Sequence, residues 1–72
     1  MNLDYKEAYL AMYEFLNDFY DRTKSDEVGG LLGEMSLLGD GSTADPAAWE
    51  DWLRCIEKIE NGQGRDPYLR LK

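Results

Sequence analysis

Three stretches of the chain repeat their apolar positions at helical spacing. In the first, residues 3–23, apolar side chains recur every three or four residues and so fall on one arc of roughly 160° around a helix axis. The arc holds Tyr5, Ala8, Tyr9, Met12, Tyr13, Phe15, Leu16, Phe19 and Tyr20. An arc this wide exceeds what a single neighbouring helix covers, so we expect two helices to pack against it.

The opposite side of this first helix carries carboxylates. Glu7, Glu14, Asp18 and Asp21 fall together when successive residues are placed 100° apart. A solvated outer face is the ordinary role of such a stripe. The second interpretation is a docking face for a cationic partner, and the sequence leaves both open.

A shorter second helix is predicted over residues 26–36, with Ser25 as its N-cap. Its apolar stripe consists of Val28, Leu31, Leu32 and Met35. Gly29, Gly30 and Gly33 each cost roughly 1 kcal/mol of helix stability relative to alanine. We therefore expect either a close approach of another helix at the glycines or a segment that is bent or partly unwound.

The third helix, residues 46–61, has the clearest beginning in the chain. Asp45 is its predicted N-cap, Pro46 its first residue, and Gly62 its C-terminal cap. One arc carries Ala48, Trp49, Trp52, Leu53, Ile56 and Ile59. We expect the two tryptophans to anchor the core, with a partner-facing aromatic patch as the alternative, and Cys55 to be a packed thiol.

Together these elements predict an all-α fold, a small three-helix bundle with a short C-terminal tail, forming one domain over residues 1–72. Residues 39–44 form a loop between the second and third helices. The tail, residues 63–72, either docks along the bundle through Tyr68, Leu69 and Leu71 or is loose.

Composition narrows the possible chemistry. The chain has 15 acidic and 8 basic residues, a net charge of -7, one cysteine and no histidine. Disulfide scaffolds, His/Cys metal sites and histidine-based triads are therefore excluded. The loop beginning at Asp40 lacks the glycine and the glutamate that an EF-hand requires at its sixth and twelfth positions. We expect no metal, no cofactor and no enzymatic activity.

The charge also restricts the partners. Phosphates of nucleic acids repel an acidic surface, and no apolar run is long enough to span a membrane, so we expect neither nucleic acid nor membrane as a direct partner. A basic protein is favoured. The candidate contacts are the four acids of the first helix and a second group formed by Asp40, Glu50 and Asp51. Asp45 is a weaker candidate because capping already uses its carboxylate.

Two segments resemble a known class of proteins. Residues 33–52 read GEMSLLGDGSTADPAAWEDW, and residues 5–9 read YKEAY before an aromatic helix. They are similar to small acidic immunity proteins of bacterial contact-dependent growth inhibition and related polymorphic-toxin systems, over most of residues 4–57. The resemblance implies a cytoplasmic protein that binds the toxic domain of a cognate effector, often a basic nuclease, and blocks its active site.

A different class of function also fits the sequence. The wide aromatic arc of the first helix suits a structural or adaptor module that forms a homodimer or docks on a larger complex. Mimicry of DNA by ordered carboxylates is a third hypothesis that the charge permits. The sequence alone does not separate these from immunity.

Overall fold

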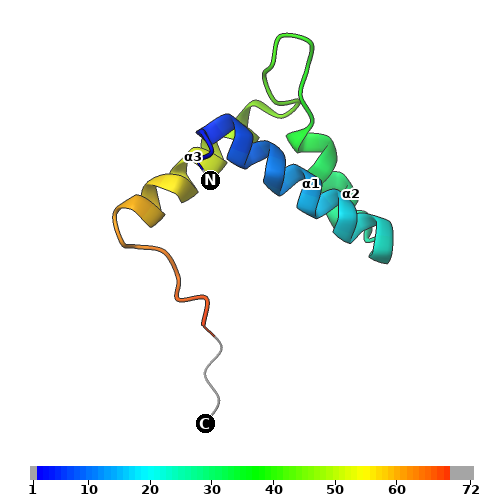
Figure 1. Ribbon diagram of the computed structural model, residues 1–72. Helices are drawn as coiled ribbons and strands as arrows, with labels where there is room; N and C mark the ends of the chain where they lie inside the picture. Colours follow the sequence, from blue (N-terminus) through cyan, green and yellow to red (C-terminus); the bar gives the residue numbers. More distant parts are fainter. Residues whose placement is uncertain (1, 69–72) are drawn as a thin grey trace.

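The fold is an all-α three-helix bundle, as the apolar spacing predicts. The computed structural model describes residues 2–68. Helix α1 spans Tyr5–Thr23, α2 spans Asp26–Met35 and α3 spans Pro46–Glu60 (Figure 1). These helices begin and end within two residues of the predicted bounds. Tyr68 in the tail is exposed rather than docked, and the predicted contacts of Leu69 and Leu71 lie outside the described residues.

A capping box begins α1, and a tight turn brings α2 back beside it. The Asp4 carboxylate accepts a hydrogen bond from the Glu7 amide at 2.7 Å, and the Glu7 carboxylate accepts one from the Asp4 amide at 3.1 Å. Lys24 ends the helix with a left-handed φ of 52°, and Ser25 then caps α2 directly. With so short a connection, α2 runs antiparallel to α1 (Figure 1).

The glycine-rich segment is a regular helix through Met35, so the expectation of a bent or unwound segment is wrong. A Cβ atom placed on Gly29 would lie 2.9 Å from Cε1 of Tyr20, whereas Gly30 and Gly33 face open space. The close approach is therefore made by an aromatic side chain of α1, not by a helix backbone, and it concerns Gly29 alone of the three.

Backbone hydrogen bonds hold the loop between α2 and α3 against the C-terminal end of α2. Leu37 and Thr43 form an isolated antiparallel bridge. The Ala44 amide donates to the Ser36 carbonyl at 2.7 Å, and the Thr43 hydroxyl donates to the Asp45 carbonyl at 2.6 Å. These bonds fix the backbone at Asp45, whose carboxylate then caps α3 as predicted.

An aromatic cluster joins α3 to α1. The ring of Tyr9 meets the rings of Trp49 and Trp52 edge-on, at centroid distances of 5.2 and 5.3 Å. The two indoles stack on each other at 5.3 Å, and Tyr5 meets Trp52 at 6.4 Å. Both tryptophans are half-buried in this cluster, as the anchoring role requires. Beyond it α3 diverges from α1, and Gly62, at φ 72°, follows its end (Figure 1).

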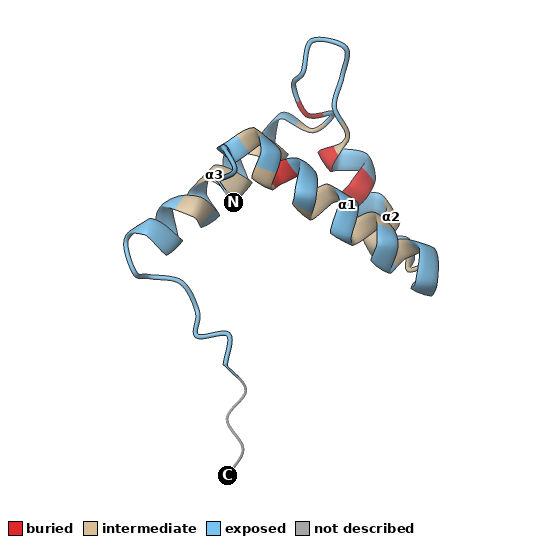
Figure 2. Cartoon of the chain, viewed as in Figure 1, coloured by how far each residue is buried: buried red, intermediate tan, exposed pale blue. Residues whose placement is uncertain are grey.

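Among residues 2–68, the buried residues lie on α1, on α2 and in the loop that follows α2 (Figure 2). In this described part of the chain they are Tyr9, Leu32, Met35 and Thr43. The prediction that two helices cover the apolar arc of α1 is wrong for its C-terminal part, because Phe15 is 64% exposed. Ile59, on the predicted apolar arc of α3, is 68% exposed. Cys55, predicted to be packed, is also exposed. The cause is the divergence of α3, which covers only the N-terminal part of α1.

Candidate functional site

The acidic stripe of α1 lies on the surface, and its four carboxylates have different surroundings. All four are exposed. Glu7 is engaged in the capping box, and Asp21 lies 3.9 Å from the Lys24 ammonium. The side chains of Glu14 and Asp18 have no hydrogen bond or ion pair to any other residue in the part of the chain that the structure describes. Two carboxylates, one helical turn apart, are thus available to an outside partner.

The second acidic group is mostly engaged within the chain. The Asp40 carboxylate accepts hydrogen bonds from the amide of Ser42 at 2.9 Å and from its hydroxyl at 2.6 Å. These bonds stabilise the ionised form and lower the pKa of Asp40. Asp51 pairs with Arg54. Glu50 alone of the group has no such contact among residues 2–68.

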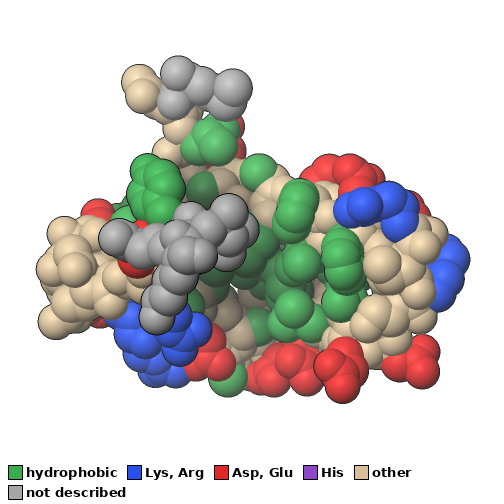
Figure 3. Space-filling view, turned by 90° about the horizontal axis from the view of Figure 1, so that it is seen from below, with side chains coloured by type: hydrophobic (Ala, Val, Ile, Leu, Met, Phe, Trp, Pro, Cys, Tyr) green, Lys and Arg blue, Asp and Glu red, His purple; other side chains and the backbone are tan. Residues whose placement is uncertain are grey.

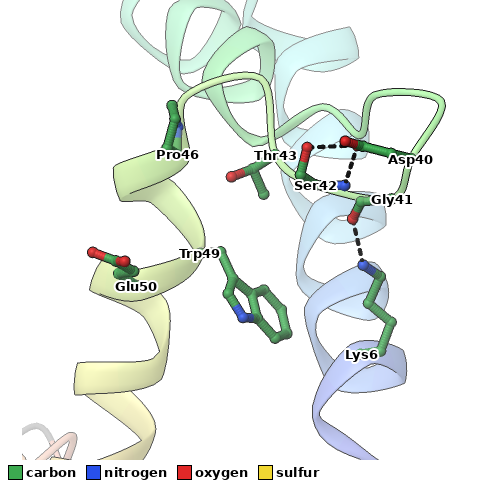
Figure 4. A pocket seen from close by; sticks show the side chains of 8 residues that line it. All are labelled: Lys6, Asp40, Gly41, Ser42, Thr43, Pro46, Trp49 and Glu50. Atoms are coloured by element: carbon green, nitrogen blue, oxygen red, sulfur yellow. Dashed lines mark hydrogen bonds between the residues drawn. The ribbon is translucent and has the colours of Figure 1, made fainter.

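Asp40 and Glu50 line one pocket but do not converge in it. The pocket, of about 420 Å³, lies between the loop, the beginning of α1 and α3 (Figure 4). Lys6 reaches into it, donating to the Gly41 carbonyl at 2.9 Å and lying 5.3 Å from the Trp49 ring centroid. Glu50 points away from the loop that carries Asp40 (Figure 4). The basic residue that lines this pocket, Lys6, was not singled out by the sequence reasoning.

The tyrosine hydroxyls act as structural donors. Tyr5 donates to the Glu60 carboxylate at 2.9 Å, and this hydrogen bond with the nearby negative charge raises the pKa of Tyr5. Burial raises the pKa of Tyr9. Both phenols therefore hold their protons at neutral pH, which opposes a role as general base.

The sequence reasoning missed an exposed apolar surface beside the acidic stripe. Phe15 and Phe19 of α1 and Leu31 of α2 are exposed. Three half-buried apolar residues each precede one of them by three positions on the same helix: Met12, Leu16 and Val28. We call these six residues the apolar face. The sequence does contain a signal for this surface, namely the roughly 160° width of the apolar arc on the first helix. Any part of that arc that no other helix covers remains exposed to solvent.

The acidic stripe and the apolar face are surface features of the described residues. Among residues 2–68, no three Asp, Glu or Cys side chains gather as a metal site requires. None of the three described helices combines the length and apolar composition needed to cross a bilayer. No family profile, curated protein or solved structure matches the chain. A functional proposal therefore depends on the acidic stripe and the apolar face themselves.

Proposed function

We propose that this chain is a non-catalytic binding protein of the cytoplasm that neutralises a basic toxin domain, nuclease-like in its surface chemistry, by covering its active site. One observation carries the proposal. Glu14 and Asp18 are exposed and unengaged among the described residues, directly beside the exposed ring of Phe15. Charged and apolar contacts side by side are what a protein interface combines.

The electrostatics favour a basic partner. The chain has a net charge of -7, so it attracts a cationic protein over a distance of about one Debye length, roughly 8 to 10 Å. A nuclease binds its substrate phosphates through lysine and arginine. Carboxylates such as Glu14 and Asp18 can occupy those positions and exclude the substrate. Because neither has an internal partner to give up, binding costs no rearrangement of the described acids.

A second candidate function, an adaptor or homodimer, is favoured by a different observation. Phe15 on α1 and Ile59 on α3 are both more than 60% exposed, which is unusual for large apolar side chains. A symmetric dimer through these residues would double the solution mass. Light scattering over a range of concentrations separates the two candidates: the binding proposal expects a monomer, and a stable dimer favours the second.

Co-expression tests the proposal. The effector gene beside this gene should encode a toxic C-terminal domain, and cells that express that domain should survive when this chain is present. Glu14→Lys and Asp18→Lys should each reduce survival. Glu57→Lys is the matched control, because Glu57 is an exposed carboxylate on α3, outside the stripe. Death of the co-expressing cells, or equal survival with Glu14→Lys and Glu57→Lys, would contradict the proposal.

A further inference from the structure

The apolar face lies on one side of the antiparallel pair formed by α1 and α2. The ring of Tyr20 on α1 lies against Gly29 of α2, and Leu32, one turn after Gly29, is buried. Two antiparallel helices that lie side by side are related by an approximate twofold axis perpendicular to the plane that contains them. This rotation keeps each side of the plane unchanged. On both helices, the residue just before one that faces the partner helix therefore points to the same side of the pair. Phe19 precedes Tyr20 and Leu31 precedes Leu32. Both are exposed, Phe19 by 37% and Leu31 by 42%, on that shared side.

Carboxylates line both edges of the apolar face. On α1, Asp18 lies one turn from Phe15, about 60° around the axis, with Glu14 one turn before it. On α2, Glu27 and Glu34 lie one turn before and one turn after Leu31. Figure 3 shows hydrophobic side chains gathered across the middle of the view, with Asp and Glu side chains along the lower border and both acidic and basic side chains at the upper right.

The four rim carboxylates are all available. Glu14, Asp18, Glu27 and Glu34 are exposed, and none has a hydrogen bond or ion pair from its side chain to another residue within residues 2–68. The α1 edge also holds one cation, because the Arg22 guanidinium lies 5.6 Å from the Phe19 ring centroid. A ligand on the apolar face therefore meets mainly negative charge along the α1 edge and carboxylates along the α2 edge. The apolar face with its acidic rim therefore favours a ligand that has an apolar side and positive charge beside it.

We infer that the apolar face binds one amphipathic helix of the partner, with lysine or arginine on both sides of its apolar stripe. This inference rests on the proposed function and names the part of the basic partner that docks. A second copy of the chain is disfavoured, because it would place rim carboxylates against rim carboxylates. The shorter helix of the pair has 10 residues, so the face is roughly 15 Å long. It accommodates about three turns, whose anchors occupy positions i, i+3, i+4 and i+7.

A synthetic peptide tests the inference with the full chain. The probe is a fluorescein-labelled helix of about 12 residues with leucine at the anchor positions and lysine on both flanks. The comparison peptide has the same composition in shuffled order, so it keeps the charge and loses the apolar stripe. Fluorescence anisotropy should show micromolar binding of the first peptide and at least tenfold weaker binding of the second.

Variants of the chain locate the binding. Phe15→Ala should weaken binding of the helical peptide about tenfold, and Glu27→Gln with Glu34→Gln should weaken it and reduce its salt dependence. Leu10→Ala is the matched control: Leu10 is an exposed apolar residue of α1 that follows Tyr9 and points to the other side, beside Leu37. It should change nothing. Because Phe15 is exposed, its variant should keep the wild-type circular dichroism.

Three outcomes would overturn the inference: equal binding of both peptides, equal effects of Phe15→Ala and Leu10→Ala, or a dimer of the chain that Phe15→Ala dissociates. The co-expression assay separates this failure from that of the proposed function. If the wild-type chain protects cells and Phe15→Ala protects them equally, the inference fails and the proposed function stands. If the wild-type chain gives no protection but the peptide result holds, the proposed function fails and the apolar face keeps its helical ligand.

Discussion

The phenolic oxygen of Tyr9 lies 3.0 Å from the main-chain carbonyl oxygen of Met35 and donates a hydrogen bond to it, with both residues buried. The same tyrosine ring meets Trp49 and Trp52 edge-on. One side chain of α1 thus contacts the last residue of α2 with its hydroxyl and α3 with its ring. Tyr9 therefore contacts both other helices and helps to hold the three helices in their mutual position.

Substitutions of Tyr9 should have graded effects on stability. Tyr9→Phe keeps the ring but leaves the Met35 carbonyl without its donor, which should lower the free energy of unfolding by about 1 kcal/mol. Tyr9→Ala also empties the aromatic cluster and should cost about 3 to 5 kcal/mol, which unfolds a domain of marginal stability. Urea titration measures both. Phe15→Ala, on the same helix, should change stability by less than about 0.5 kcal/mol; equal losses for Tyr9→Phe and Phe15→Ala would contradict this assignment.

The glycines of α2 should differ in how they tolerate alanine. Gly30 and Gly33 face open space, so Gly30→Ala and Gly33→Ala should each stabilise the protein by about 0.5 to 1 kcal/mol through helix propensity. Gly29→Ala would bring a Cβ atom to 2.9 Å from the Tyr20 ring and should gain less or lose stability. Thermal melts of the three variants give the comparison. Equal gains at all three positions would show that Tyr20 moves aside without cost.

The Asp40 carboxyl in the loop should lose its proton at a lower pH than an ordinary aspartate does. Hydrogen bonds from Ser42 lower the pKa of Asp40, so NMR titration of its side-chain carbon should give a midpoint below the ordinary 3.8. The folded-state pKa is the depressed one. Its contribution to stability is therefore present above the unfolded-state pKa and is lost as pH falls through the folded-state pKa.

The control for this titration is Ser42→Ala. It removes the hydroxyl donor at 2.6 Å and leaves the amide donor at 2.9 Å, so the Asp40 midpoint should rise part of the way to 3.8. A midpoint that does not move on this substitution would mean that the hydroxyl contributes nothing to the lowered pKa.

Association with a basic partner should depend on salt through the acidic stripe. Glu14→Gln combined with Asp18→Asn should slow association several-fold at low ionic strength and flatten its dependence on salt, because both carboxylates are uncompensated among the described residues. Stopped-flow fluorescence measures the rate constant. Asp51→Asn should have a smaller effect, since Arg54 already offsets that charge. Unchanged rates for the double variant would remove α1 from the contact surface.

Local signals predicted the helices because each helix end depends on residues next to it in the chain. Ser25 caps α2 and Asp45 caps α3, as their identities and positions indicate. The burial of Thr43 was not predictable in this way. It depends on the pairing of Thr43 with Leu37 and on the path of the loop against α2, which no periodic pattern encodes.

The site was predictable only in part for the same reason. Helical spacing placed Glu14 and Asp18 on one stripe, and the structure keeps them there. Spacing also placed Phe15 on an apolar arc, but it does not say how far a neighbouring helix extends along that arc. Because α3 diverges from α1 beyond the aromatic cluster, no helix covers Phe15, and its side chain is part of the surface.

The aromatic cluster provides a built-in optical reporter. Trp49 and Trp52 are the two tryptophans of the chain, and both stand at the junction of α1 and α3. Tryptophan fluorescence therefore reports on the junction of α1 and α3 alone. The wavelength and quenching of tryptophan emission should follow the detachment of α3 from α1, whereas far-ultraviolet circular dichroism records the helical content of all three helices. An emission change that precedes the loss of helical content would show that the third helix leaves α1 first.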